Sequence, residues 1–345
     1  SASRSFSITV QNDAPSNHFN TVLYTGTGSS ESITSVGFAP DFVWIKDRDA
    51  TNWHNLQDTI RGATKHLYSN ATNAEDTTSN GLTSFDSNGF TIGGGGGFGN
   101  NGNNFVAWNF KAGGAAVANT DGTINSQVSV NNTLGFSIVK WSTSTTLATV
   151  GHGLSSAPEL IIGKGINWSS SWPVYALPIG NTKKMSLNDT SIPSTSTIWG
   201  NTTPTATTFN QDFTGTAGRT NIAYCFTSKP GFSKVGSYTG TGAAGNNVVT
   251  GFEPAFVMVR KVNGGSWLMY DNKRNTSNPR NTTLVADTSR VDYTTNLLAI
   301  NFLSNGFQIT GTDSDYNANG ETYLYLAIAA DGSTATPSLA NSFAT

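Results

Sequence analysis

The sequence predicts an all-β protein made of three consecutive, related modules, each a β-sandwich or jelly-roll-like unit. Short runs rich in β-branched and aromatic residues are bounded by Gly, Asn, Asp or Pro, as is typical of strands, for example at 41–46, 105–110, 255–259 and 322–328. No window longer than about 12 residues keeps a helical period. The same landmarks occur three times, about 100 residues apart, which is the spacing of domains rather than of thin solenoid repeats.

The first landmark is a strand that ends in a polar turn. Residues 22–28 recur at 235–242, and a weaker version occupies 138–143. The copies are offset by 117 and 97 residues, measured between the aromatic residues Tyr24, Trp141 and Tyr238.

The second landmark is a proline that opens an apolar run ending in a basic residue, at 40–46, 158–164 and 254–260. A tryptophan follows the proline by 13, 14 and 13 residues, at Trp53, Trp172 and Trp267. We therefore expect the strands that carry Val43, Ile161 and Val257 to be equivalent.

A third landmark, the turn Ser-Asn-Gly-Phe, occurs at 87–90 and 304–307 and is missing from the second copy. An aromatic residue follows that Phe by 18 residues in both copies, at Trp108 and Tyr325. Because they lie in strongly apolar strands, we expect four aromatic side chains to be buried: Trp44, Trp108, Tyr224 and Tyr325.

These landmarks divide the chain into an N-terminal arm and a C-terminal tail around three modules. The glycines and asparagines of 113–134 predict a linker between the first two modules. The expected boundaries are 1–19 for the arm, 20–112, 135–228 and 231–332 for the modules, and 333–345 for the tail.

Composition excludes several classes of protein. Charged residues make up 12% of the chain and the net charge is -2, so nucleic acid is not an expected partner. The longest strongly apolar stretch, 323–330, is far shorter than the roughly 20 residues of a membrane-spanning helix, so no membrane insertion is expected. The single cysteine, Cys225, lies in an apolar run and is interpreted as a buried structural thiol. The chain starts at Ser1 without an initiator Met, which indicates a processed form or part of something longer.

One glycine motif formally matches a dinucleotide fingerprint: Gly94, Gly96 and Gly99. That fingerprint needs a strand before it and a helix after it, because the helix N-terminus meets the pyrophosphate. Here an asparagine-rich segment and another strand follow, so we interpret the motif as a hairpin loop. No cofactor is expected.

The equivalent loop of the third copy alternates oxygen ligands as a calcium loop does, with Asp313, Asp315 and Glu321 as the weak metal candidates. The glycine stands at position 8 of this loop rather than 6, and position 12 carries no Glu. A polar turn is the favoured interpretation. The four histidines lack zinc-site spacing, and no pair of carboxylates is clustered in the sequence, so no catalytic residues are expected.

The three repeated tryptophans, Trp53, Trp172 and Trp267, are the weak candidates for ligand binding. Their amphipathic rings could stack on sugars at a lectin-like face. Occurrence at the same place in every copy instead favours a core position, and both interpretations remain open at this point.

The order of the motifs at 19–26, 40–46 and 61–65 resembles a repeat domain of uncharacterised function found in virion proteins of tailed phages, notably marine phages. The second copy adds 135–139 and 150–154, and the third adds 231–234 and 302–307. The resemblance covers about residues 19–330 and implies a virion structural or tail-fibre-like protein with no defined catalytic residues.

The sequence thus predicts a non-enzymatic structural protein on the surface of a tailed phage virion, outside the cell: a fibre, an appendage or a capsid-decorating component. Assembly and adhesion are its expected activities. Expected partners are further copies of the chain, with a trimer favoured because open strand edges need cover, other virion proteins and a host-surface glycan. The alternatives are an array of carbohydrate-binding modules and a glycan depolymerase.

Overall fold

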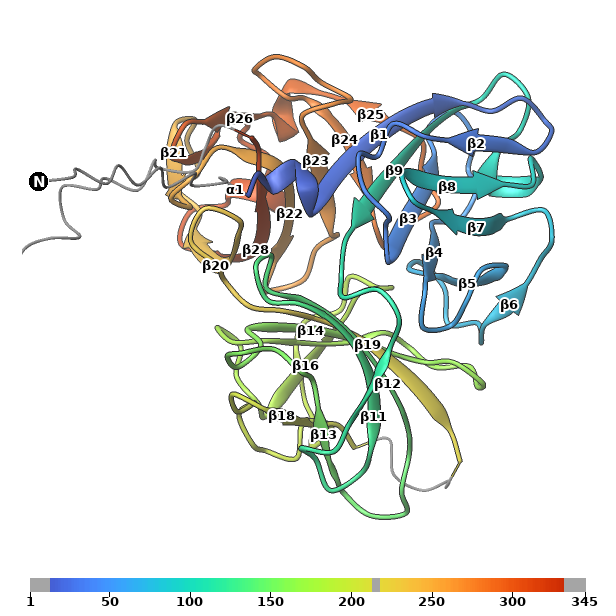
Figure 1. The fold of residues 1–345 in the computed structure, drawn as a ribbon. Helices are drawn as coiled ribbons and strands as arrows, with labels where there is room; N and C mark the ends of the chain where they lie inside the picture. The colour runs from blue at the N-terminus through green and yellow to red at the C-terminus, as the bar shows by residue number, and fades with distance from the viewer. Residues whose placement is uncertain (1–12, 213–217, 332–345) are drawn as a thin grey trace, which may run out of the picture.

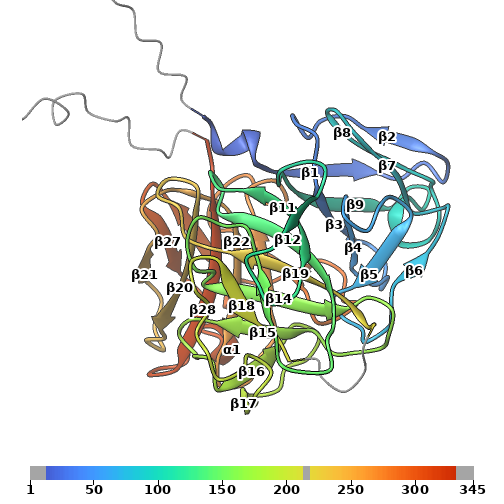
Figure 2. The same cartoon turned by 60° about the horizontal axis from the view of Figure 1, so that its bottom comes forward.

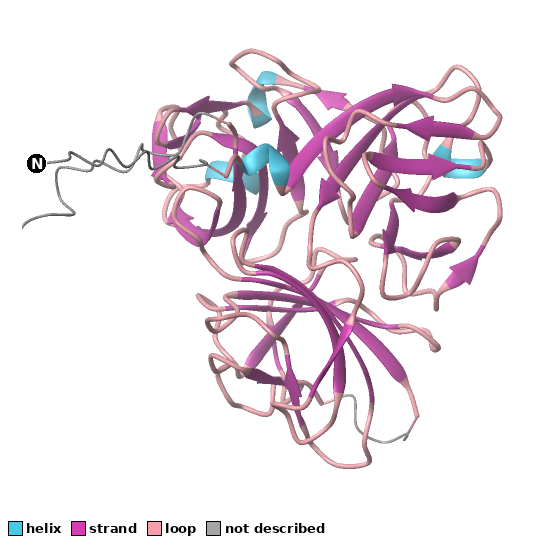
Figure 3. Cartoon of the chain, in the orientation of Figure 1, coloured by secondary structure: helices cyan, strands magenta, loops and turns pink. Residues whose placement is uncertain are grey.

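The computed structural model describes residues 13–212 and 218–331 and confirms the all-β, sandwich-like fold (Figures 1 and 3). Within these residues helix is confined to four short turns: η1 (Pro15–Asn17), η2 (Gly96–Phe98), η3 (Asn296–Leu298) and α1 (Ser314–Asn317). The expected tail, 333–345, and residues 1–12 of the expected arm lie outside the described residues. The rest of the arm is structured, because η1 leads directly into the first strand.

Module 1 packs a six-stranded sheet against a three-stranded sheet. The large sheet has the order β1 (Phe19–Thr25), β9 (Asn104–Phe110), β3 (Phe42–Asp47), β4 (Asn55–Asp58), β5 (Lys65–Tyr68), β6 (Asp76–Thr77). The small sheet has the order β2 (Glu31–Ile33), β8 (Gly89–Ile92), β7 (Leu82–Asp86).

Module 3 repeats this order in both of its sheets. The large sheet is β20 (Ser233–Thr239), β28 (Thr322–Ala329), β22 (Pro254–Lys261), β23 (Leu268–Asp271), β24 (Thr282–Val285), β25 (Tyr293–Thr294). The small sheet is β21 (Asn246–Val249), β27 (Gly306–Ile309), β26 (Ile300–Leu303).

Module 2 has the same six strands in its large sheet: β12 (Phe136–Ser142), β19 (Thr220–Phe226), β14 (Leu160–Gly165), β15 (Pro173–Ala176), β16 (Lys183–Ser186), β17 (Ser194–Thr195). Its small sheet is reduced to β13 (Thr149–Gly151) and β18 (Thr208–Asn210). Across the three modules, Val43, Ile161 and Val257 lie on the third strand of the large sheet and are fully buried.

The segment 113–134 differs from the expected linker. It contains β10 (Val117–Asn119) and β11 (Ser126–Asn131), which extend the large sheet of module 2 beyond β12. The glycine at 113 allows two backbone segments to approach closely and does not form a flexible joint. A Cβ on Gly113 would lie 2.8 Å from the backbone of Val130.

The Ser-Asn-Gly-Phe landmark forms the tight turn of the hairpins β7–β8 and β26–β27. Its glycines, Gly89 and Gly306, have φ values of +152° and +153°. A Cβ at Gly89 would lie 1.8 Å from the carbonyl oxygen of Ile33, and a Cβ at Gly306 would lie 2.0 Å from that of Val248. The motif therefore recurs because this turn touches the backbone of the neighbouring strand.

The third strand of each large sheet is buried on both faces: every residue of β3 and β14 is buried, and so is every residue of β22 except Lys261. One face of each sheet packs on the small sheet of its own module. The other face contributes to a single hydrophobic core shared by all three modules (Figures 1 and 2). In that core the ring of Phe42 lies 4.4 Å from Tyr224 of module 2, and Phe19 lies 5.6 Å from Phe256 of module 3.

The four aromatic residues predicted to be buried are buried, which confirms that expectation: Trp44, Trp108, Tyr224 and Tyr325. Tyr325 nevertheless faces the core of module 3 alone, whereas the other three face the shared core. The register shows that Leu326 is the counterpart of Trp108, because Leu326 pairs with Met258 as Trp108 pairs with Trp44.

The modules contact one another around a ring, and two of its three junctions repeat the same contact. The indole Nε1 of Trp172 in module 2 donates to the carbonyl of Tyr68 in module 1, at 2.8 Å. The indole Nε1 of Trp267 in module 3 donates to the carbonyl of Ser186 in module 2, at 3.0 Å. Tyr68 and Ser186 are equivalent residues of β5 and β16. This head-to-tail arrangement is the geometry of a cyclic trimer, formed here within one chain.

The basic residues that end the second and third apolar runs also act at these junctions. Lys164 is buried, and its Nζ donates to the carbonyl of Thr72 in module 1 at 3.0 Å. Arg260 donates to the carbonyls of Ser186 and Ser191 in module 2, both at 2.6 Å. Carbonyl oxygens thus accept from the buried cations, while burial lowers the pKa of Lys164 to about 8.

Candidate functional site

The three candidate tryptophans occupy different environments. Trp172 and Trp267 are buried at module junctions, so they present no face to a ligand. Trp53 is 43% exposed. The strand register explains the difference. Gln57, Tyr175 and Tyr270 pair with equivalent residues of the third strand in the three modules. Three residues before each of them stand His54, Trp172 and Trp267, so His54 and not Trp53 is the counterpart of the buried tryptophans.

Backbone contacts support this correction by one residue. The backbone N–H groups of Trp172 and Trp267 donate to the side chains of Asn188 and Asp287, each at 2.8 Å. The N–H of His54 donates in the same way to Asn70, at 3.1 Å. Trp53 therefore lies just outside the repeated pattern, and its side chain is available at the surface of module 1.

Trp53 lines a surface groove of about 410 Å³ in module 1. The groove lies between the loop that precedes β4, the strands β5 and β6, and the glycine-rich loop that contains η2. Its aromatic members, besides Trp53, are His66, Tyr68 and Phe98; its polar members include Asn52, Asn55, Asp76 and Asn80.

The aromatic side of the groove is held by edge-to-face contacts. The rings of Trp53 and Tyr68 are 4.6 Å apart at 69°, and those of His66 and Phe98 are 5.6 Å apart at 77°. The Nε2 of His66 lies 2.6 Å from the hydroxyl of Tyr68. These contacts fix the rings that flank Trp53, so part of the groove is preformed.

The glycine-rich loop forms the opposite side. The motif at Gly94, Gly96 and Gly99 leads through η2 into strand β9. The expected hairpin loop is wrong, because the segment connects β8 of the small sheet to β9 of the large sheet and these two strands do not pair. The side-chain amide of Asn55 donates to the carbonyl of Gly97 at 3.2 Å. A Cβ on Gly97 would lie only 2.9 Å from that amide nitrogen, so glycine allows the loop to rest directly on Asn55.

The groove carries one carboxylate and no basic side chain of Lys or Arg among its lining residues. That carboxylate, Asp76, is exposed and lies 3.7 Å from the Nε2 of His66. Burial lowers the pKa of His66, so its imidazole is neutral at neutral pH. Burial, together with the charge of Asp76, raises the pKa of Tyr68 to about 12, so its phenol is neutral as well.

The repeat shows which groove residues are particular to module 1. In modules 2 and 3 the counterparts of Trp53 are Ser171 and Ser266, and those of Asp76 are Ser194 and Tyr293. Sequence reasoning singled out Trp53 but missed His66, Tyr68 and Asp76. These residues could have been found by comparing the three copies, because each of them differs from its counterparts in both other modules.

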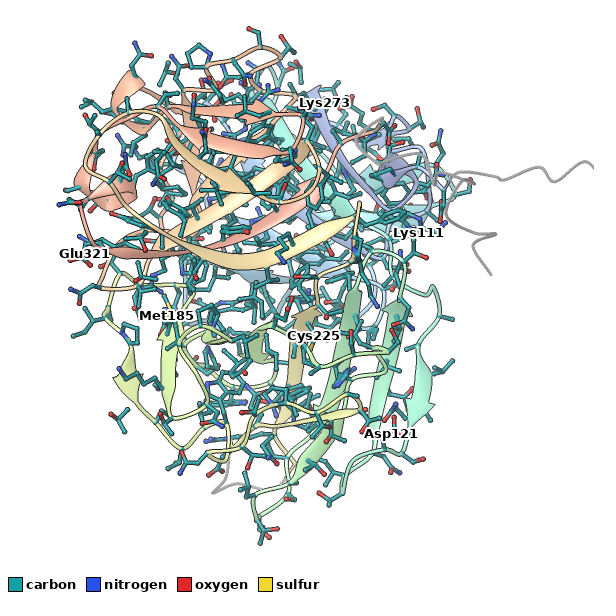
Figure 4. The ribbon with its side chains drawn as sticks, turned by 90° about the vertical axis from the view of Figure 1, so that its left-hand side faces the viewer. Lys111, Asp121, Met185, Cys225, Lys273 and Glu321 are labelled. Carbon is teal, nitrogen blue, oxygen red and sulfur yellow. The ribbon has the colours of Figure 1, made fainter. Side chains whose placement is uncertain are left out.

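The metal candidates do not converge. Asp313 is the N-cap of α1, where its side chain accepts a hydrogen bond from the N–H of Asp315 at 2.9 Å. Glu321 lies at the periphery of module 3 (Figure 4). Throughout residues 13–212 and 218–331, no three His, Cys, Asp or Glu side chains gather as a metal site would require. The expected polar turn contains a four-residue helix, whose Tyr316 and Asn317 are buried.

Cys225 is buried inside module 2, which confirms its interpretation as a buried thiol (Figure 4). Burial raises its pKa, so the thiolate is disfavoured. His152 is also buried, and its Nδ1 accepts from the backbone N–H of Leu154 at 3.1 Å.

The fold and the groove define a class of protein: a single-chain ring of three β modules with a polar, aromatic-lined surface site on one of them. The chain belongs to the family of the domain of unknown function DUF7483, which it matches over residues 14–331. The family unit is thus the whole three-module body. No curated protein matches the chain, and no solved structure matches it. Among the described residues, no helix has the length and apolar character needed to cross a membrane.

Proposed function

We propose that this protein is a structural component of the virion surface of a tailed phage, which acts by assembly and adhesion rather than by catalysis. The observation that carries the proposal is the core shared by three modules, since it makes one rigid body from a chain of modest charge. The resemblance of the repeated motifs to phage virion proteins supports the same role. The surface groove supplies a place for adhesion.

The body has two distinct ends. Ser16 donates its backbone N–H to the side chain of Asp331 at 2.8 Å, so both ends of the described chain leave from one side. Phe19, which follows Ser16, lies at the same end of the large sheet of module 1. The loop before β4, which carries Trp53, follows the opposite end of β3. The groove is thus remote from the side where the chain ends leave.

Assembly in this proposal uses the outer surface of the ring. A trimer of chains was expected because strand edges need cover, but three modules already close around one another within a single chain. The added strand β10 presents an exposed edge residue, Val117, which is 61% exposed. We propose contacts with other virion proteins or further copies at such outer edges.

Two alternative functions receive less support. An array of three carbohydrate-binding modules requires three exposed aromatic platforms, whereas Trp172 and Trp267 are buried. A glycan depolymerase normally requires two carboxyl groups about 5 to 9.5 Å apart. The groove has a single carboxylate, Asp76, among its lining residues.

The proposal is tested on purified virions of a phage that encodes the chain. A density map and labelling with an antibody against the three-module body are expected to place it on the outer surface. Absence from purified virions, or burial inside the capsid, would overturn the structural role. Incubation with host surface polysaccharide is expected to yield no new reducing ends, and their appearance would overturn the non-enzymatic role.

A further inference from the structure

We infer that the groove of module 1 binds a neutral hexopyranose unit of a surface glycan, with the sugar ring stacked on Trp53. This inference rests on the proposed adhesive function and names the ligand class of its site. It predicts a single glycan site per chain, because the equivalent positions of modules 2 and 3 carry different residues.

The exposure of Trp53 is the first support. A tryptophan side chain that is 43% exposed leaves a large apolar surface in contact with water. The apolar C–H face of a pyranose covers such a surface, while its hydroxyl groups remain available to polar neighbours. The contact of Trp53 with Tyr68 at 4.6 Å restrains the indole before a ligand arrives.

The polar neighbours around Trp53 match the hydroxyl groups of a sugar. Asp76 and Asn80 are exposed and line the groove together with Trp53. A carboxylate accepts hydrogen bonds from two hydroxyl groups, and a side-chain amide both donates and accepts. The groove volume of about 410 Å³ falls within the range of roughly 300–1,000 Å³ that is usual for small-ligand sites.

The charge of the groove selects among sugars. The only carboxylate of the lining is Asp76, and neither Lys nor Arg is present to neutralise an acidic ligand. Uronic acids, sialic acids and phosphorylated sugars would bring a like charge next to Asp76. A neutral hexose or N-acetylhexosamine is therefore the class that the groove favours, and the lack of a basic side chain also argues against a nucleic-acid ligand.

The repeat supplies a matched control. Tyr293 is the counterpart of Asp76 in module 3 and is itself an aromatic residue that is 37% exposed. It lies against the guanidinium of Arg290, 3.6 Å from the ring centre. If any exposed aromatic residue of this fold bound sugars, Tyr293 would contribute as Trp53 does.

The test titrates the full chain with maltotetraose, cellotetraose, mannotetraose and chitotetraose, and with tetragalacturonate as the anionic probe. Calorimetry measures affinity, and the indole N–H resonance of Trp53, assigned by its loss in Trp53→Phe, reports the site. We expect at least one neutral probe to bind, to shift this resonance and to bind at least tenfold more weakly to Trp53→Ala. Tyr293→Ala is expected to bind as the parent does. Unchanged melting temperatures would show that the variants remain folded.

Binding of no neutral probe, tighter binding of tetragalacturonate, or equal losses in Trp53→Ala and Tyr293→Ala would each overturn the inference. The glycan site and the proposed virion role can fail independently of each other. A protein on the virion surface that binds no neutral probe retains its structural role and loses the glycan site. A protein that binds sugars at Trp53 but is absent from the virion retains the site and loses the virion role.

Discussion

Modules 1 and 3 share a scaffold and differ at the surface. In both, a buried Asp and the Arg three residues later form an ion pair, Asp58 with Arg61 at 2.5 Å and Asp271 with Arg274 at 2.6 Å. Only module 1 places an exposed tryptophan beside a glycine-rich loop. The comparison teaches that the repeated positions serve packing and ring closure, whereas the proposed binding site lies where one copy departs from the repeat.

Module 2 has no ion pair at the positions where modules 1 and 3 have one. Its counterparts of the Asp and the Arg are Ala176 and Ile179, both apolar. Buried ion pairs often contribute no more stability than well-packed apolar residues, because desolvation offsets their attraction. These two positions of the module can therefore hold either a complete ion pair or two apolar residues.

The largest expected effect concerns the shared core. Trp108 is fully buried, lies 5.9 Å from Phe256 of module 3 and donates its Nε1 to Asp271 at 3.2 Å. Trp108→Ala should lower the free energy of unfolding by about 5 kcal/mol, because it opens a cavity and removes a donor from a buried carboxylate. Chemical denaturation measures the change. A loss below about 1 kcal/mol would show that the three modules do not depend on a common core.

The second expected effect concerns the buried ion pair of module 3. It compares the stability of a variant that loses one partner of the pair with that of a variant that loses both. Asp271→Ala should cost about 3 kcal/mol, because it removes the buried carboxylate partner of Arg274 and leaves the partly exposed Asp292, at 3.0 Å, as the remaining carboxylate. The double variant Asp271→Ala with Arg274→Ile copies module 2 and should recover at least half of that loss. Denaturation of both variants checks this, and a double variant less stable than the single one would contradict the comparison.

The third effect is a pH dependence to which His54, a residue particular to module 1, contributes. His54 replaces the junction tryptophans, and its Nδ1 accepts from the Nε1 of Trp44 at 2.9 Å. Burial is the main cause that lowers the pKa of His54 well below 6.5. The unfolded chain therefore binds a proton that the folded protein excludes, so stability is lost as pH falls below about 6.5.

The expected loss for His54 is about 1 kcal/mol between pH 6.5 and 5.5, and the slope approaches about 1.4 kcal/mol per pH unit below that range. His66 and His152 have pKa values lowered by burial in the same direction. His54→Gln should reduce the slope of unfolding free energy against pH by about one proton. An unchanged slope in this variant would show that His54 is protonated in the folded protein.

The smallest expected effect is at the rim of a junction. Arg48 of module 1 and Asp292 of module 3 form an ion pair at 2.7 Å, with 22% and 17% of their side chains exposed. Because the pair is partly solvated, Arg48→Ala should cost about 1 kcal/mol or less. Added salt should weaken the difference between parent and variant. A loss above about 3 kcal/mol would contradict this expectation, because a partly solvated pair would then contribute as much as a buried one.

The sequence predicted the three repeats, the all-β class and the burial of Trp44, Trp108, Tyr224 and Tyr325, because apolar strands and glycine turns leave local signals. It misplaced Trp53 as the partner of Trp172, since two adjacent aromatic residues at 53 and 54 fit nearly the same spacing. The shared core depends on contacts between modules that no local pattern specifies. The sequence contains one indication of this core. Residues 42–45 are all apolar, without the alternation of apolar and polar residues that a strand with one exposed face shows, which indicates a strand buried on both faces.

The central claim is that the three modules form one cooperative body, and Cys225 tests it directly. This buried thiol belongs to the core of module 2, separate from Trp108 of module 1. The measurement is the rate at which a thiol reagent labels Cys225 under native conditions, in the parent and in Trp108→Ala. If the modules open together, a loss of about 5 kcal/mol should accelerate labelling by roughly 4 × 10³-fold, matching the change in global stability. Labelling of Cys225 at the parental rate, in a variant whose module 1 is destabilised, would contradict the shared core.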